Sequence, residues 1–509
     1  MKKITILLSA VAGLLFSSCN MDQSPIGTLD DVTAIQNVTD LRNARNGIYD
    51  HLRSCVTGGY IYLTDLQMDQ FMGLTINGNR NGIMAHGTIL SNNSSIEGVW
   101  AGMYADIADA NYFLGRADVL LENPNLNEDQ VHEINRYIAE VKFARAYFYY
   151  MLFDRFCDTY SAAEANTPAK GLPLTTVFNP TGDVSSYPGR STMAETFALI
   201  DGDLSEAYQG LQTWERYSGE TATPMAMYVN SNTVLALEAR LALLRSNWTG
   251  AINLAQELIN TGVYTLAGVS GTTYLRMWTQ DTANELIFRP ISSNTELGIS
   301  STGGAYISDN VEAADYIPTY ETLLYYDDND IRFDCYFEPR NLNANGQYYP
   351  AYTFIKYPGN AALQTGTNNN LMNMGKPFRL SETYLILAEA AAQAGENDIA
   401  NAALTTLRQN RIRNYRATTY NGEELIQQIR EERTKELLGE GFRMSDLRRW
   451  GLGFTRDASY PPNPAVTEIF NAIDATVAYS SGDYRYVWPI PSTEMQNNPQ
   501  LKGQQNPGY

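Results

Sequence analysis

Histidine and cysteine are scarce in this chain, whose 509 residues include three histidines and four cysteines. So few histidines leave little material for a histidine-based metal or acid–base site. The HExxH, GxSxG, Walker and GxGxxG motifs are missing as well, which removes the common zinc-protease, serine-hydrolase and nucleotide-binding templates. We therefore expect no cofactor, and these enzyme templates do not apply. A glycoside hydrolase with paired carboxylates stays open as an alternative, because 56 acidic residues offer many such pairs.

Positive charge is also in deficit, with 36 basic against 56 acidic residues and a formal net charge of −20. Such a surface repels phosphate backbones and anionic membranes, so nucleic acid is not an expected partner. It disfavours sulfated or uronic-acid-rich glycans for the same reason. Tyrosine is abundant, with 34 residues against 17 phenylalanines. A flat apolar ring with a hydroxyl suits polar, ring-shaped ligands, although packing in loops explains the abundance equally well.

Long apolar runs are absent after the N-terminus, where a charged start precedes the short apolar stretch Ile4–Phe16. This stretch is too short to span a bilayer and is typical of a secretory signal. Small residues then lead directly into Cys19, as in lipoprotein signals, although Phe16 stands where Leu is usual. We predict a signal peptide over 1–18, a lipid on Cys19 and a polar tether over 19–30. Ordinary signal cleavage beside a chance cysteine is the alternative.

The three other cysteines are Cys55, Cys157 and Cys335. Their odd number and wide spacing give neither a disulfide framework nor a CxxC metal motif. We expect buried thiols, or one bridge and a spare thiol.

Apolar residues recur every three or four positions over much of the remaining chain, which predicts amphipathic helices. The stretch 231–264 should form two helices that break near Asn247, and 378–413 should form a helix, a Gly-containing turn and a second helix. Paired helices with small residues and Gly turns are typical of tetratricopeptide-like stacking. The other predicted helices cover residues 41–53, 99–121, 128–156, 191–211 and 422–450.

Two segments lack a long helical pattern. The segment 265–375 is rich in Gly, Ser, Thr, Asn and Tyr, which predicts a loop-rich insertion with short strands and helices, and 57–98 is a second irregular region. Long loops on a rigid scaffold commonly carry binding sites. Sugar rings stack their C–H faces on Tyr or Trp and hydrogen-bond through their hydroxyls to Asn, Asp or Arg. The segment 265–375 also offers Tyr348, Tyr349 and Tyr352. The residues chosen as ligand-binding candidates are Asp69, Asn79, Arg80, Trp100, Tyr306, Tyr316 and Tyr320.

Two charged stretches invite other interpretations. The acids of "DDNDIRFD" (327–334) suggest calcium, but the central Gly and distal Glu of an EF-hand loop are missing. We predict a solvated turn with an ion-paired Arg332. The stretch "IREERTKELLGEGFR" (429–443) should form pairs on a helix surface, for example Glu432 and Glu436 with the nearby arginines.

Several motifs together resemble the SusD/RagB family of Bacteroidetes outer-membrane lipoproteins. "AEVKFARAYFYYMLFDRF" (139–156) is similar to the family's helix before its first long loop. "FRLSETYLILAEAAAQAG" (378–395) and "IREERTKELLGEGFRMSDLRRW" (429–450) are similar to its C-terminal helical motifs. The chain end "VWPIPSTEMQNNPQLKGQQNPGY" (487–509) resembles the family ending. The resemblance covers nearly the whole mature chain.

The resemblance implies a mostly α fold, with a tetratricopeptide-like helical scaffold and a loop-rich insertion that contains short strands. It implies a non-enzymatic, lipid-anchored protein of the outer membrane, facing the cell exterior. Such a protein captures oligosaccharide, or peptide in the RagB-like alternative, and delivers it to a SusC-like TonB-dependent transporter. The expected regions are an N-terminal helical part (31–270), a ligand-binding insertion (271–375) and a C-terminal helical part (376–509).

Overall fold

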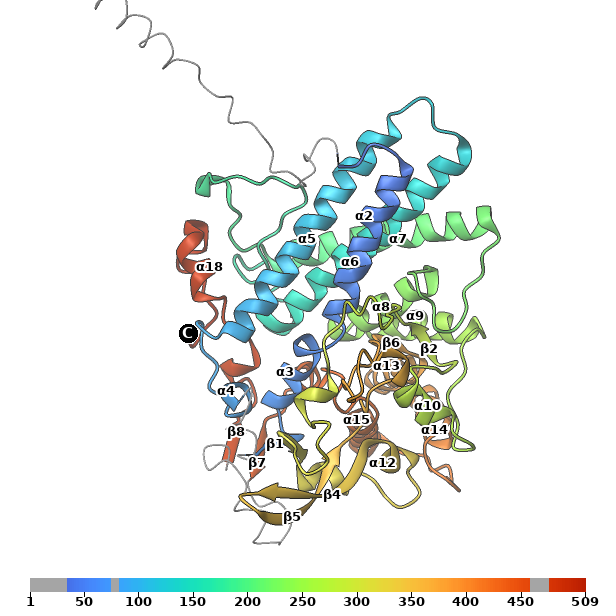
Figure 1. The fold of residues 1–509 in the computed structure, drawn as a ribbon, viewed down its shortest axis with the longest axis vertical. Helices are drawn as coiled ribbons and strands as arrows, with labels where there is room; N and C mark the ends of the chain where they lie inside the picture. The colour runs from blue at the N-terminus through green and yellow to red at the C-terminus, as the bar shows by residue number, and fades with distance from the viewer. Residues whose placement is uncertain (1–33, 75–81, 458–475) are drawn as a thin grey trace, which may run out of the picture.

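Four long helices form the upper half of the molecule in the computed structural model, which describes residues 34–74, 82–457 and 476–509. Figure 1 shows three of them, α2, α5 and α6, running side by side. Within the described ranges no helix is long and apolar enough to cross a membrane. The predicted signal peptide, Cys19 and the tether lie outside these ranges. The long helices are α2 (Val38–Cys55), α5 (Ser94–Leu121), α6 (Glu128–Phe156) and α7 (Met193–Ser218).

Side-chain caps explain where these helices begin. Asn127 and Thr192 each cap a helix and form a reciprocal capping box with the residue three positions on, which satisfies two free backbone N–H groups. Helix α7 ends at Gly219, whose φ of 74° gives a left-handed cap. The predicted helix over 128–156 is confirmed, and the helix predicted over 191–211 continues to Ser218.

A second group of helices packs below the first. The predicted break near Asn247 is confirmed, because this side chain accepts a hydrogen bond from Gly250 N and caps the second helix of the pair. Alanines from two helix pairs share one core, among them Ala239, Ala255 and Ala388, so the backbones approach closely. The helices are α8 (Ser231–Leu244), α9 (Trp248–Asn260), α13 (Leu380–Gln393), α14 (Asn397–Gln409), α15 (Gly422–Glu436) and α16 (Arg443–Trp450).

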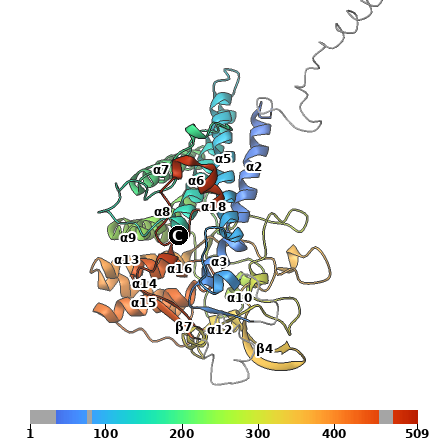
Figure 2. The ribbon, with the colours of Figure 1, turned by 90° about the vertical axis from the view of Figure 1, so that its left-hand side faces the viewer.

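The strands are short and form four two-stranded antiparallel sheets within the described residues. The pairs are β1 (Phe71–Gly73) with β3 (Tyr316–Pro318), β2 (Leu286–Phe288) with β6 (Phe378–Arg379), β4 (Phe337–Ala344) with β5 (Gln347–Phe354), and β7 (Phe454–Asp457) with β8 (Thr476–Tyr479). Figures 1 and 2 place the β4–β5 hairpin at the end of the molecule away from the long helices. The short helices are α3 (Gly59–Gln67), α4 (Gly82–Ala85), α10 (Thr273–Thr279), α11 (Tyr320–Leu324), α12 (Ile331–Tyr336) and α18 (Ser492–Asn497).

A buried ion cluster joins this loop-rich part to the C-terminal helices, and it corrects the prediction of surface pairs over 429–443. Glu436 is fully buried and accepts hydrogen bonds from Arg332, Arg379 and Arg411, which come from distant parts of the chain. These three guanidinium groups hold the pKa of the Glu436 carboxyl well below its usual range against the effect of burial. Glu432 is buried beside Arg332 and Arg408.

The same cluster includes two residues of the acidic stretch 327–334, for which we predicted a solvated turn. The predicted ion pair of Arg332 is confirmed, with Asp330 as its partner at 2.7 Å. The prediction of a solvated turn holds for Asp327 and Asp328, which are exposed, and is wrong for this buried pair. Asp330 caps α12 and also contacts Lys435 of α15, so it belongs to the interior.

Candidate functional site

Strand β1 brings together the two loop segments, 57–98 and 265–375, that supply all the ligand-binding candidates except Trp100. It pairs with β3, so that Phe71 lies opposite Pro318 and Gly73 opposite Tyr316. Thr319 reinforces the contact, because its backbone N–H donates to the carbonyl of Gln70 at 2.9 Å. The first loop segment is therefore fixed against the insertion.

Three of the predicted ligand-binding residues lie in the packed interior. Trp100, Tyr306 and Tyr316 are buried, and their rings present no face to solvent. Trp100 packs between Tyr104 and Phe156 at ring-centroid distances of 4.8 and 4.9 Å. Stacking on a ligand requires an exposed ring face, so these three side chains serve packing in this conformation.

The other candidates have different surroundings. Asp69 forms an ion pair with Arg443 at 2.5 Å and ties the β1 loop to α16. Asn79 and Arg80 lie outside the described residues. Tyr320, at the start of α11, keeps 37% of its surface exposed and follows β3, which contacts β5. Its binding role stays a prediction.

The β4–β5 hairpin has an exposed face, and none of the ligand-binding residues predicted from the sequence lies on it. Its turn is Asn345-Gly346, where both residues have positive φ (55° and 84°), as a tight type I′ turn requires. Along β5, Tyr349 and Ala351 point into the core. Tyr348 and Tyr352 alternate with them and remain 56% and 36% exposed. The period-two pattern of "QYYPAYTF" is the sequence signal that could have found these two rings.

Polar side chains surround these rings. Cross-strand pairing sets Asn343 opposite Tyr348 and Pro339 opposite Tyr352, with the exposed Asn341 between them on β4. Together, Tyr348, Tyr352, Asn341 and Asn343 make up what we call the hairpin face.

A groove of about 550 Å³ runs along one side of the hairpin face, between β4 and residues 311–312. The Tyr348 hydroxyl lies 3.2 Å from Glu312 Oε1, and Asn343 Nδ2 lies 3.5 Å from the other carboxylate oxygen, so Glu312 orients both groups. Arg340 is held by Glu338 at 2.7 Å. A flat ring beside amide, carboxylate and guanidinium groups can hold a sugar ring by stacking and its hydroxyls by hydrogen bonds.

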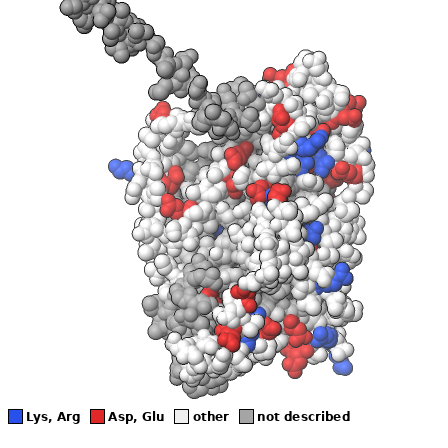
Figure 3. Space-filling model, in the orientation of Figure 1, with Lys and Arg blue, Asp and Glu red and all other residues white. Residues whose placement is uncertain are grey.

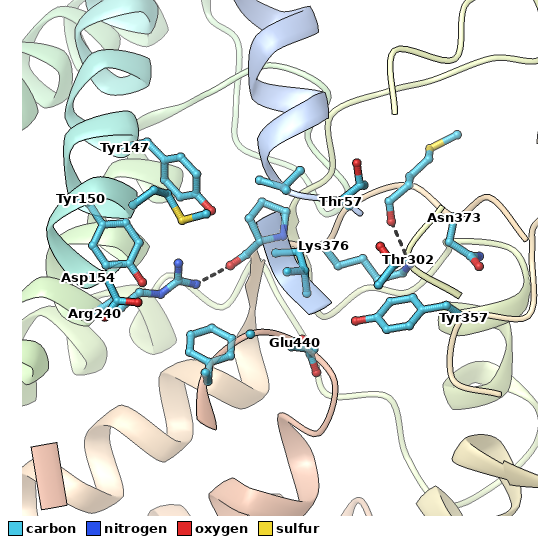
Figure 4. Close-up of a pocket in the computed structure, with 18 of the residues that line it drawn as sticks. Thr57, Tyr147, Tyr150, Asp154, Arg240, Thr302, Tyr357, Asn373, Lys376 and Glu440 are labelled. Atoms are coloured by element: carbon cyan, nitrogen blue, oxygen red, sulfur yellow. Dashed lines mark hydrogen bonds between the residues drawn. The ribbon is translucent and has the colours of Figure 1, made fainter. Parts of the chain in front are cut away.

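A second cavity lies where the scaffold meets the insertion, and Figure 4 shows its lining. Tyr147, Tyr150 and Asp154 of α6 face it from one side, and Lys376 and Glu440 from the other. Burial raises the pKa of the Tyr150 hydroxyl to about 12. The cavity holds about 50 Å³, enough for a few water molecules and too little for an oligosaccharide.

Neither charge nor metal-ligating groups dominate the described surface. Figure 3 shows acidic and basic side chains interspersed over one face, with wide uncharged areas between them. Among the described residues no group of three or more His, Cys, Asp or Glu side chains is arranged to hold a metal ion. Cys55, Cys157 and Cys335 are buried free thiols. The prediction of buried thiols is therefore confirmed, and the alternative of one bridge with a spare thiol is wrong.

Comparisons with known proteins agree with the fold. Residues 336–509 match a family model described as SusD family, and residues 29–234 match one described as starch-binding associating with outer membrane. A SusD-like protein P2 from Formosa agariphila is 22% identical over 561 residues, which covers all of both chains.

Solved structures show the same architecture. A SusD superfamily protein from Bacteroides thetaiotaomicron has a TM-score of 0.77 and 23% identity, over 93% of this chain and 100% of that one. A protein described as sugar-binding from Bacteroides vulgatus has a TM-score of 0.71 and 24% identity, over 94% and 100%. The predicted mostly helical fold with a loop-rich, short-stranded insertion is confirmed. The two descriptions that name an activity, starch-binding and sugar-binding, name binding and not catalysis.

Proposed function

The chain belongs to the SusD/RagB family, and from this premise we propose that it is a cell-surface lipoprotein that binds a neutral oligosaccharide or polysaccharide. The ligand is then delivered to a SusC-like TonB-dependent transporter in the outer membrane. The family descriptions support the carbohydrate and the association with the outer membrane. The lipid on Cys19, the outward orientation and the transporter partner are proposed from the sequence.

The observation that carries the proposal is the hairpin face. Tyr348 and Tyr352 are exposed on one side of a rigid hairpin, and Glu312 fixes the hydroxyl of the first ring. Rings that are already held in place lose little conformational freedom when a sugar stacks on them. The neighbouring amides of Asn341 and Asn343 supply donors and acceptors for sugar hydroxyls.

An open site of this kind favours weak binding. Shallow, hydrated contacts give dissociation constants of roughly micromolar to millimolar, or about 4–8 kcal/mol. Weak capture suits a protein that must release its ligand to a transporter. Attachment through Cys19 would keep the site beside the membrane, and the high local concentration offsets the low affinity.

The charge balance supports a neutral ligand. The net charge of −20 repels polyanions over the molecule as a whole. At the groove itself the charge of Arg340 is offset by an ion pair with Glu338 at 2.7 Å.

Binding to a glycan panel tests the proposal. The mature protein is run in native gels that contain amylopectin, mixed-linkage β-glucan, galactomannan or arabinoxylan, and we expect retardation by at least one of them. Analysis of the same glycans for reducing ends should detect no products, and turnover would favour the hydrolase alternative. Calorimetric binding of peptides, with no glycan bound, would favour the RagB-like alternative.

A further inference from the structure

Two surface grooves flank helix α6 and share Lys142 in their walls. One, of about 510 Å³, lies between α5, α6 and residues 176–180. The other, of about 370 Å³, lies between α6 and α7. Because both include Lys142, they open on the same side of α6, and we call them together the α6 face. Figures 1 and 2 place these helices at the end of the molecule away from the β4–β5 hairpin.

Aromatic rings line each groove. Tyr112 and Phe178 make an edge-on contact at 5.2 Å in the α5–α6 groove. Trp214 and His132 line the α6–α7 groove, and His132 stacks on Tyr217 at 3.7 Å. Tyr217 is 40% exposed. Aromatic rings therefore line the grooves on both sides of Lys142, and Arg136 lies over the Trp214 ring at 4.8 Å.

The centre of the α6 face is polar but electrically balanced. Lys142 forms an ion pair with Glu206 across the two helices. Arg145 is buried and makes a bidentate contact with Asp203, with both distances at 2.7 Å. Since these charges are paired, the centre offers no preference for a polyanion or a polycation.

Close packing of the two helices creates the α6–α7 groove. A Cβ on Gly210 would lie 2.8 Å from the Cβ of Ala139, so only glycine permits this approach. The small residues form a low floor, and longer side chains form the walls. Exposed amide and hydroxyl groups of Asn135, Gln209 and Thr213 lie along these walls. They can exchange hydrogen bonds with the hydroxyls of a ligand lying on the floor.

We propose that the α6 face is a second binding surface for a neutral oligosaccharide, separate from the hairpin face. The aromatic rings in the two grooves match the apolar faces of sugar rings, and the paired charges and exposed amides match their hydroxyls. A long polysaccharide that reaches both surfaces is held more tightly than either alone would hold it. This inference rests on the proposed carbohydrate-binding function.

Titration calorimetry with short glycans tests the number of sites. The probes are maltoheptaose, cellohexaose, mannohexaose and xylohexaose, each long enough to fill one surface. For the glycan that binds, we expect two sites on the full mature chain. Trp214→Ala and Phe178→Ala should each weaken the α6 face roughly tenfold, because each removes one stacking surface. Trp248→Ala is the matched control, since Trp248 is a partly exposed tryptophan on α9 outside both grooves.

Thermal unfolding and the number of binding sites distinguish a misfolded variant, an absent α6 site and a wrong proposed function. Phe178 lies on a loop outside the core and Trp214 is only partly buried, so each variant should still unfold in one cooperative transition, with a modest decrease in Tm from the lost contacts to Tyr112 or Glu220. Removal of the hairpin rings by Tyr348→Ala and Tyr352→Ala should leave one site. A single wild-type site that disappears with the hairpin rings overturns the α6 face and leaves the proposed function standing. Absence of binding by every glycan overturns both, and binding of a peptide alone at Trp214 overturns the carbohydrate assignment.

Discussion

Replacement of Glu436 by glutamine should destabilise the whole protein, because this carboxylate joins three arginines inside the buried ion cluster. Its two oxygens accept four hydrogen bonds of 2.8–3.0 Å, from Arg332, Arg379 and twice from Arg411. Glutamine keeps one acceptor oxygen and turns an NH₂ group toward guanidinium groups. About two charge-assisted hydrogen bonds are lost, at roughly 1.5–3 kcal/mol each.

The expected cost is therefore about 3–6 kcal/mol, which overlaps the roughly 3–5 kcal/mol found when one partner of a buried ion pair is removed. Urea unfolding followed by circular dichroism measures it, with the change taken from the midpoint at constant slope. Glu431→Gln is the control, since Glu431 lies more than one turn before Glu436 on the same helix, outside the cluster, and should cost less than about 0.5 kcal/mol.

The dependence on pH gives a second test of the same reasoning. The pKa of Glu436 is depressed in the folded state, so its contribution is complete above the unfolded value of 4.5 and decreases as the pH falls below it. The difference in the free energy of unfolding between wild type and Glu436→Gln should be constant between pH 6 and 8. It should become smaller as the pH falls below 4.5. A Glu436→Gln cost equal to that of the Glu431 control would refute the role of the cluster.

Three further predictions concern buried titratable groups. Burial raises the pKa of Asp65 to about 7, so the folded state loses stability as the pH rises from about 4 to 7, and Asp65→Asn should be more stable than wild type at pH 8 in urea unfolding. Hydrogen bonds to Asp106 and Asp109 raise the pKa of His51 to about 10. Its imidazole should stay protonated at pH 9 in an NMR titration, and the stability it gives should disappear as the pH rises through 10; titration near 6.5 would contradict this. Burial raises the pKa values of the Cys55 and Cys157 thiols, so both should react with a thiol reagent only after unfolding.

The helices could be predicted from the sequence because their signals are local. The bounds of α6 follow from the cap at Asn127 and from apolar residues at helical spacing, all within one stretch. The break at Asn247 is local in the same way. Neither depends on a distant part of the chain.

The ion cluster and the surroundings of the binding candidates depend on contacts between distant segments. Local sequence patterns could not predict which of these side chains are buried. Glu432 and Glu436 have arginines at helical spacing, yet their partners, such as Arg332 and Arg411, come from other segments and bury them. Tyr306 has polar neighbours in the sequence and is nevertheless buried beneath Phe71 and Phe354. Local composition says nothing about which face of a loop a partner segment covers.

The measurement that tests the central claim most directly is glycan affinity after removal of the hairpin rings. Tyr348→Ala/Tyr352→Ala is compared with Tyr484→Ala, which removes an exposed tyrosine outside the hairpin. Both are measured in the Trp214→Ala/Phe178→Ala background, which removes a ring from each groove of the α6 face, with the neutral oligosaccharide that the wild-type protein binds. We expect at least a tenfold loss of affinity in the double variant and no change in the control. Equal affinity in the two would contradict the assignment of the hairpin face as the binding site.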